Sequence, residues 1–172
     1  MRVENRESRS FKNFLSLLKI QQMIRVYPSS KVKHAPMWRK LQQEVPHVFF
    51  NARWIKRAEK ESELKNDDFR DLWKECRQDI EDADALLVYA EDGDHLKGEL
   101  VEVGMALASN VKVILVTSIK DKHVYGTWMH ADQVDWATAM DEALSLLYAM
   151  TDKGKREEKK KFIDEFLSGV KR

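Results

Sequence analysis

Carboxylates crowd one stretch of this 172-residue sequence. Residues 79–102 contain nine Asp or Glu side chains and one Lys. Glu99 and Glu102 lie three positions apart in a segment with helical spacing, so they share one helix face. Asp79 falls at the edge of an apolar helical stripe, where a carboxylate needs a partner or a function. Two carboxylates beside one cleft suit glycosidic chemistry, in which one attacks the sugar and another group manages protons.

Structural roles for the same acids are the open alternatives. Asp94 can cap the helix that begins near Gly98, and Glu99 lies in the first turn of that helix. The pattern alone favours a solvent-facing position for Glu102, away from the apolar stripe. Asp79 can be a hydrogen-bonded acid near the end of its own helix.

The elements that would position these acids alternate between strand and helix. Short strands are predicted at residues 23–27, 48–50, 85–89 and 112–117. The second is expected to continue toward Trp54 and Ile55. The third and fourth are apolar on both faces, as in a parallel sheet that helices cover on both sides. We therefore predict an α/β fold, a flavodoxin-like open parallel sheet of about five strands with helices on both faces.

Helical spacing fills the segments between the strands. One helix follows Pro36, and another begins at about residue 67 with a stripe formed by Phe69, Leu72, Trp73, Cys76, Ile80 and Ala83. A helix at 98–109 is predicted to face the sheet with Leu100, Val101, Gly104, Leu107 and Ala108. It is apolar nearly all round, so a second subunit or the rest of the chain should cover its outer side. A helix is also predicted at 140–150, and the charged stretch 56–68 is expected to be a mobile loop.

Composition indicates one folded domain, since 43% of the residues are hydrophobic and 34% charged, with only six Gly and three Pro. We assign it to residues 23–150, between a basic helical extension at 1–22 and a charged helix at 151–172. The longest apolar run, 85–90, is too short to cross a bilayer. With no secretory signal pattern and one cysteine, Cys76, the protein is expected to be cytoplasmic and to lack disulfides.

The net charge of +1 hides an uneven distribution. The two ends carry +6 together, which leaves −5 for the middle. An acidic central surface disfavours a polyanion, so nucleic acid is not an expected ligand of the core. Neither a dinucleotide glycine fingerprint nor a P-loop occurs. His123 and His130 have no further ligands in view, so we assign no metal and no cofactor.

Three motifs together resemble a known family. They are Tyr27-Pro28-Ser29-Ser30 after the first strand, the acidic segment 79–88 leading into the third, and Gly98-x-x-x-Glu102-x-Gly104. Over residues 24–147 the chain resembles the nucleoside 2-deoxyribosyltransferase-like family, which includes 2'-deoxynucleoside 5'-phosphate N-hydrolases. The resemblance implies that Glu102 is a nucleophile that attacks the anomeric carbon and forms a covalent glycosyl-enzyme.

Further site residues follow from this resemblance. It implies that Asp79, or Asp84 in its place, activates the leaving base. It also implies that Asp94 binds the sugar and that Tyr27 lies near the substrate, and we expect Ser29 and Gly98 of the same motifs to contact it. Two tryptophans, Trp54 and Trp128, could stack on a base, and His130 could touch the substrate. Core positions for the tryptophans and a structural role for His130 are the alternatives.

The resulting hypothesis is N-glycosidic bond cleavage or base exchange on a (deoxy)nucleoside or nucleotide, by a hydrolase or a transferase. One alternative is a non-catalytic nucleotide- or nucleobase-binding module, in which the carboxylates only cap and solubilise. Another is an N-glycosidase that acts on NAD or another modified ribonucleotide. The identity of the base and sugar, the need for a 5'-phosphate and the size of the expected homo-oligomer stay open. No membrane partner is expected.

Overall fold

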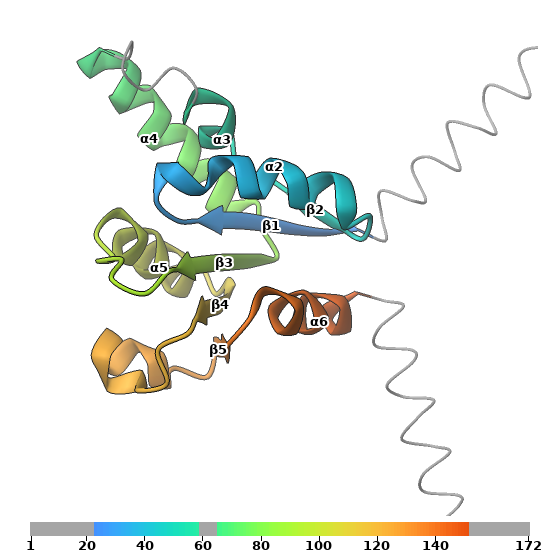
Figure 1. Cartoon of the computed structure of the whole chain (residues 1–172). Helices are drawn as coiled ribbons and strands as arrows, with labels where there is room; N and C mark the ends of the chain where they lie inside the picture. Colours follow the sequence, from blue (N-terminus) through green and yellow to red (C-terminus); the bar gives the residue numbers. More distant parts are fainter. Residues whose placement is uncertain (1–22, 59–64, 152–172) are drawn as a thin grey trace, which may run out of the picture.

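Five parallel strands form the centre of the fold in a computed structural model that describes residues 23–58 and 65–151. Their order is β2-β1-β3-β4-β5, which is the flavodoxin-like order (Figure 1). The strands are β1 (Ile24–Ser29), β2 (Val48–Phe50), β3 (Ala85–Ala90), β4 (Lys112–Thr117) and β5 (Val134–Ala137). The predicted fold class is therefore confirmed, and β4 has the predicted bounds.

Helices connect the strands and cover both faces of the sheet (Figure 1). They are α2 (Ala35–Glu44), α3 (Trp54–Arg57), α4 (Asn66–Glu81), α5 (Gly98–Ala108) and α6 (Met140–Met150). Right-handed crossovers place α2 and α6 on one face and α4 and α5 on the other, where α4 and α5 contact each other. The short 3-10 helices η1 (Val32–His34), η3 (Lys122–Tyr125) and η4 (Thr127–His130) follow the ends of β1 and β4.

The central strands are buried on both faces. In β3 every side chain except Tyr89 is buried, and in β4 every side chain except Lys112. This burial explains why both segments are continuous apolar runs instead of alternating ones. Because all strands are parallel, their carboxyl ends meet at one edge, and the loops that follow β1, β3 and β4 lie side by side there (Figure 1).

Two boundaries near β1 and β2 differ from the prediction. β1 continues to Ser29, two residues further than expected, even though Pro28 lies within it. The second strand stops at Phe50, and Trp54 and Ile55 begin helix α3 instead of extending the strand. The backbone N–H of Arg53 donates to Asp79 Oδ2 at 2.9 Å, which turns the chain away from the sheet.

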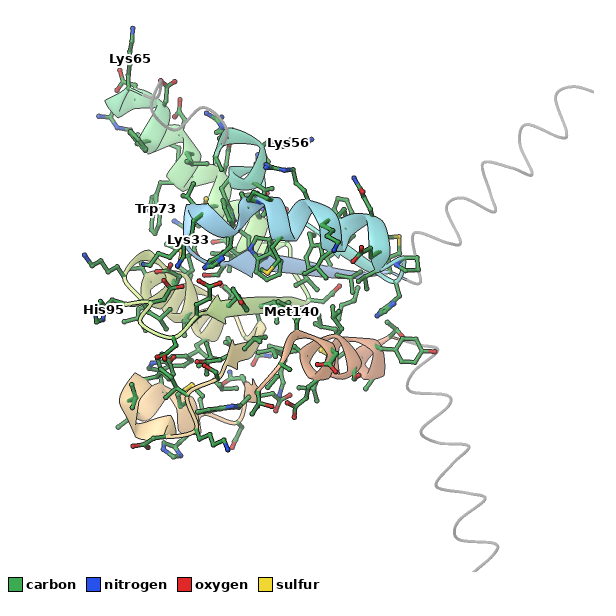
Figure 2. The ribbon with its side chains drawn as sticks, in the orientation of Figure 1. Lys33, Lys56, Lys65, Trp73, His95 and Met140 are labelled. Atoms are coloured by element: carbon green, nitrogen blue, oxygen red, sulfur yellow. The ribbon has the colours of Figure 1, made fainter. Side chains whose placement is uncertain are left out.

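The predicted faces of α4 and α5 were partly wrong. On α5 the buried side chains are Glu99, Val103 and Ala106, whereas the expected sheet-facing Leu100 and Val101 are 42% and 50% exposed. The helix is turned so that its acidic face meets β1, because polar side chains there offer hydrogen bonds. On α4, Phe69 and Trp73 are exposed although Cys76 and Ile80 are buried as expected (Figure 2).

Three predicted segments lie wholly or partly outside the described residues. They are the extension at 1–22, residues 152–172 of the charged C-terminal helix and residues 59–64 of the predicted loop. Inside the described ranges, none of the helices combines the length and the hydropathy needed to cross a bilayer.

Candidate functional site

The carboxylate of Glu102 lies against the carboxyl end of β1. Tyr27 Oη donates to Glu102 Oε1 at 2.7 Å, and Ser29 Oγ donates to Glu102 Oε2 at 2.5 Å. Tyr27 and Ser29 are fully buried, while Glu102 is half-buried on α5. The structure thus brings three of the predicted site residues together, and the solvent-facing alternative for Glu102 is wrong.

The local sequence explains this grouping. Residues two apart on a strand point to the same face, so Tyr27 and Ser29 both face α5. The loop after β3 returns α5 across the end of β1, which pairs with β3 through Ser29 and Val88. Glu102 in the second turn of α5 then meets both hydroxyls.

Burial dominates the electrostatics of this group. It raises the pKa of Glu102, and the charge of nearby Glu99 adds to this, while the hydrogen bonds from Ser29 and Tyr27 oppose it without cancelling it. Burial, followed by the charge of Glu102, raises the pKa of Tyr27 well above its usual value. Tyr27 therefore stays protonated and acts as a neutral donor to the carboxylate.

Glu99 has a structural role at the start of α5. Its Oε2 accepts a hydrogen bond from the backbone N–H of Lys97 at 2.9 Å, and Lys31 Nζ lies 3.2 Å from its Oε1. The side chain is 5% exposed, so the pair joins the segment after β1 to the first turn of α5. The structural alternative for Glu99 is therefore confirmed.

A second acidic group lies in the loop between β3 and α5. Asp94 Oδ1 is 2.9 Å from Lys33 Nζ, and Asp94 Oδ2 is 3.1 Å from His34 Nε2. Lys33 also pairs with Glu91 at 3.0 Å. Figure 2 shows Lys33 and His95, which belongs to the same loop as Asp94, at the same end of the molecule. This network links the loop to η1, so Asp94 does not cap α5 as the alternative interpretation expected.

The pKa of Asp94 is lowered, whereas that of Glu102 is raised. Burial acts to raise the pKa of Asp94, but hydrogen bonds from Lys33, His34 and the backbone of Glu91 outweigh it and lower the pKa to about 2. One atom each from His34, Glu91 and Asp94 lies within 4.8 Å of the others, a spacing that could hold a metal ion. The ammonium of Lys33 already supplies the cation for these carboxylates.

Asp79 is buried and fully engaged by Arg53. Its Oδ2 accepts from the backbone N–H of Arg53, and its Oδ1 lies 2.8 Å from Nη2 and accepts from Nε at 2.9 Å. Asp79 thereby ties α4 to the turn before α3. The substitute acid, Asp84, accepts a hydrogen bond from the backbone N–H of Arg25 at the opposite end of the sheet from Glu102. None of these contacts joins Asp79 or Asp84 to Glu102.

The other predicted substrate residues lie in different surroundings. Trp54 is 8% exposed and donates from Nε1 to the carbonyl of Pro28 at 2.9 Å, which corresponds to the core alternative. Trp128 is half-buried in η4, and its Nε1 is buried without a partner in the described part of the chain. His130 is exposed at the end of η4, and Gly98 is exposed at the first residue of α5.

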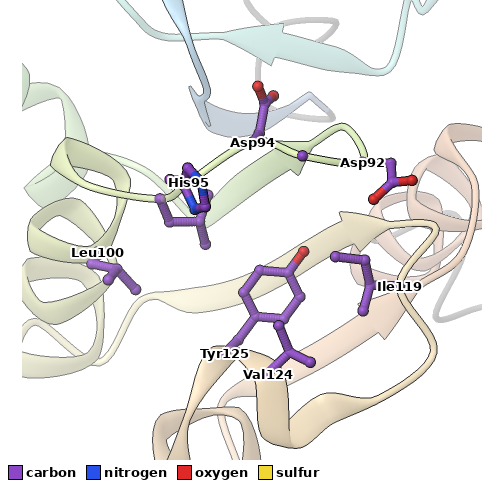
Figure 3. Close-up of a pocket in the computed structure, with 9 residues that line it drawn as sticks. Asp92, Asp94, His95, Leu100, Ile119, Val124 and Tyr125 are labelled. Atoms are coloured by element: carbon purple, nitrogen blue, oxygen red, sulfur yellow. The ribbon is translucent and has the colours of Figure 1, made fainter.

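A cavity of about 390 Å³ opens beside the same edge of the sheet (Figure 3). Its walls come from the loop after β3, from Leu100 on α5 and from the segment after β4. Asp94 contributes to its wall, but its carboxylate points toward β1, away from Tyr125 (Figure 3). Glu102 is not one of its lining residues, so the cavity and the Glu102 group are two separate features.

Sequence reasoning did not find the partners of these acids. Lys31 pairs with Glu99, and Lys33 and His34 pair with Asp94. One signal was present, since these residues directly follow β1 and the acid-rich loop directly follows the neighbouring β3. Strand order had to be known before the two loops could be paired.

Comparison with known proteins shows a similarity at the level of the fold. No protein-family model and no curated protein matches the sequence. The structure is similar to that of a 2-deoxyribosyltransferase from the psychrotolerant bacterium Bacillus psychrosaccharolyticus, with a TM-score of 0.52 and 16% identity over 70% of this chain and 90% of that chain. The match confirms the resemblance at the level of the fold.

Proposed function

We propose that this chain cleaves or exchanges the N-glycosidic bond of a (deoxy)nucleoside or nucleotide, with Glu102 as the nucleophile. The observation that carries the proposal is the half-buried Glu102 carboxylate, held by Tyr27 and Ser29 at the carboxyl edge of the sheet. Open α/β sheets bind ligands at this edge. The similarity of fold to a 2-deoxyribosyltransferase supports the same reaction class.

The reaction runs through two displacements at the anomeric carbon. A Glu102 oxygen forms a bond to C1' while the C1'–N bond breaks, and the leaving base keeps the electron pair and takes up a proton. In the second step, water loses a proton and attacks C1', which releases Glu102 and gives the free sugar. If a second base attacks instead, it loses its own proton and forms a new nucleoside.

The two hydroxyls suit a nucleophilic carboxylate. Each Glu102 oxygen accepts one hydrogen bond and keeps a further lone pair for attack. Because both donors are neutral, they orient the anion without the strong charge stabilisation of an ion pair. Burial leaves the anion less stable than it is in water, which favours its partial neutralisation by the developing positive charge at C1'.

We assign supporting roles to the other predicted acids. Asp79 holds Arg53 and the turn before α3, and the leaving base then takes its proton from water. Asp94 fixes the loop between β3 and α5 through Lys33 and His34. Both act as positioning residues in this proposal, instead of contacting the base and the sugar as the resemblance implied.

Base release tests the proposal directly. The full chain is incubated with a panel of nucleosides, nucleoside monophosphates and NAD, and free base is measured by chromatography. We expect release by the wild type and none by Glu102→Ala; addition of a second free base separates transfer from hydrolysis. Ligand-dependent thermal stabilisation without any turnover would contradict the proposal and identify a binding module.

We also propose a homo-oligomer, on the basis of apolar side chains that α4 and α5 leave exposed. Phe69, Trp73 and Val101 are 45%, 42% and 50% exposed on these two neighbouring helices. Exposed apolar groups on adjacent elements favour protein contacts. Sedimentation equilibrium is expected to show a mass above 20.2 kDa for the wild type and a smaller mass for Trp73→Glu. A monomeric wild type would refute the assembly.

A further inference from the structure

The cavity beside β3 and β4 has the size and place of a small-molecule site. Its volume of about 390 Å³ falls within the ~300–1,000 Å³ range of ligand pockets. Three segments build it: the loop at 92–96, Leu100 of α5, and Ile119, Val124 and Tyr125 after β4 (Figure 3). The Glu102 group lies on the β1 side of the same loop.

The wall after β4 is held in place by a buried hydroxyl. Tyr125 Oη and Thr117 Oγ1 are 2.8 Å apart, and Thr117 is 1% exposed at the end of β4. The next residue, Gly126, has a φ of 95°, a conformation that other residues rarely adopt. The Tyr125 ring is therefore a fixed flat surface, and Leu96, Leu100, Ile119 and Val124 surround it with aliphatic groups. These walls favour a planar, largely apolar ligand.

The rim supplies polar groups that are not already engaged. Asp92 and His95 are exposed, and neither side chain has a hydrogen bond or an ion pair with the described residues. The Asp92 carboxylate points to the side of Ile119 and Tyr125, whereas that of Asp94 points to the opposite side (Figure 3). A free carboxylate presents two acceptor oxygens, which match two parallel N–H donors on one edge of a ligand.

We propose that this cavity binds a planar heterocycle with two neighbouring N–H donors, as on the N1/N2 edge of guanine. The ring lies against Tyr125 and the aliphatic walls, and Asp92 accepts both donors. Hypoxanthine lacks the exocyclic amine and adenine also replaces the N1 donor by an acceptor, so both should bind more weakly. The site is independent of the chemistry proposed for Glu102.

Calorimetric titration of the full chain with three 9-methylated bases tests this assignment. These probes contain no glycosidic bond, so the Glu102 reaction cannot consume them. We expect 9-methylguanine to bind at least tenfold more tightly than 9-methyladenine, with 9-methylhypoxanthine between them, and Asp92→Asn to remove most of this preference. A charge-assisted pair of hydrogen bonds accounts for a factor of this size. Equal affinity for the three bases would overturn the proposal.

Two adjacent residues of α5 provide a matched control for the position of the ligand. Leu100 and Val101 are 42% and 50% exposed, but only Leu100 lines the cavity. We expect Leu100→Asp to abolish binding of 9-methylguanine, while Val101→Asp and Glu102→Ala retain it, with thermal melting used to check that each variant is folded. Loss of binding in Val101→Asp or in Glu102→Ala would place the ligand elsewhere and overturn the proposal.

A substitution in the cavity wall away from α5 provides a second test of where the ligand binds. Val124 is 61% exposed and lines the cavity from the β4 side, so Val124→Asp introduces charge without a large change in the core. Weakened binding of 9-methylguanine, by tenfold or more, is expected in this variant as well. If it binds like the wild type, the segment after β4 does not form a wall of the site and the proposal fails.

Discussion

Two carboxylates at the same edge of the sheet have partners of opposite character. Glu102 accepts hydrogen bonds from two neutral hydroxyls, those of Tyr27 and Ser29, and its pKa is raised by burial. Asp94 is paired with Lys33 and His34, and its pKa falls to about 2. Neutral donors orient a carboxylate and leave it reactive, whereas cations stabilise its charge and reduce its reactivity. In the proposed reaction, Glu102 therefore carries the chemistry and Asp94 anchors the loop.

The largest expected effect is the loss of Glu102. In Glu102→Gln the amide keeps the shape of the side chain but offers a much weaker nucleophile, so base release should fall by at least about 10³-fold. Chromatography of released base under single-turnover conditions measures this effect. Thermal melting of the same variant should show only a modest loss of stability, because the amide oxygen still accepts from one of the two hydroxyls and the other hydroxyl can turn to accept from the amide NH2.

Removal of a neutral donor should change the pH profile of that same reaction. In the proposed reaction Glu102 must be ionised to attack, so activity should rise with pH through its raised pKa. Tyr27→Phe removes a bond that favours the charged form, which raises this pKa further and moves the acid limb of kcat/KM to higher pH. We expect about a 10–100-fold loss below the limb and a smaller loss above it. Tyr89→Phe, one strand away, should leave the limb in place; a limb that moves equally in both variants would contradict this assignment.

Substitution of Asp94, in contrast to that of Glu102, should affect stability more than activity. Asp94→Asn removes the negative charge and one of the two acceptor oxygens that face Lys33 and His34, and should lower the free energy of unfolding by about 1–3 kcal/mol at pH 7. Because the folded pKa is depressed, this stabilisation is complete above the unfolded value near 4 and is lost as the pH falls through about 2. Chemical denaturation of wild type and variant from pH 7 down to pH 2 should therefore show converging stabilities.

A neighbouring acid provides the control for Asp94. Asp92 is exposed and has no partner among the described residues, so Asp92→Asn should change the free energy of unfolding by less than about 0.5 kcal/mol. Equal destabilisation by both substitutions would show that general acidity of the loop, not the Lys33 and His34 contacts, determines its stability.

Much of the fold and part of the site could be predicted from the sequence. Apolar runs locate β3 and β4, because strands buried on both faces carry few polar residues, and the strand-turn-helix order gives the parallel sheet. The family resemblance drew attention to Glu102 and Tyr27, which the structure joins by a hydrogen bond. Their roles in catalysis remain predictions.

The orientation of α5 could not be predicted from its periodicity. The helix is apolar nearly all round, so apolar residues do not mark which face is buried, and its polar residues were assigned to solvent. The buried hydroxyls of Tyr27 and Ser29 and the Lys31 ammonium attract Glu102 and Glu99 inward, which exposes Leu100 and Val101. Contacts between distant segments decide the orientation, and a single sequence does not display them.

Asp79 provides the hardest test of the contrast between Glu102 and Asp94. It is buried, as a catalytic acid can be, but it is paired with a cation, as Asp94 is. If it only anchors Arg53, then Asp79→Asn and Arg53→Met should each destabilise the fold and the double variant should be less destabilised than their sum, with a coupling of about 1 kcal/mol. Base release by the wild type and by Asp79→Asn should then show the same pH profile, without a basic limb from an acid catalyst, because the leaving base takes its proton from water. A 100-fold drop in kcat with unchanged stability, together with a basic limb that is present in the wild type and lost in Asp79→Asn, would instead make Asp79 the proton donor to the leaving base. In that case a carboxylate with a cationic partner could still take part in the chemistry. The roles of Glu102 and Asp94 would then be distinguished only by their positions in the fold.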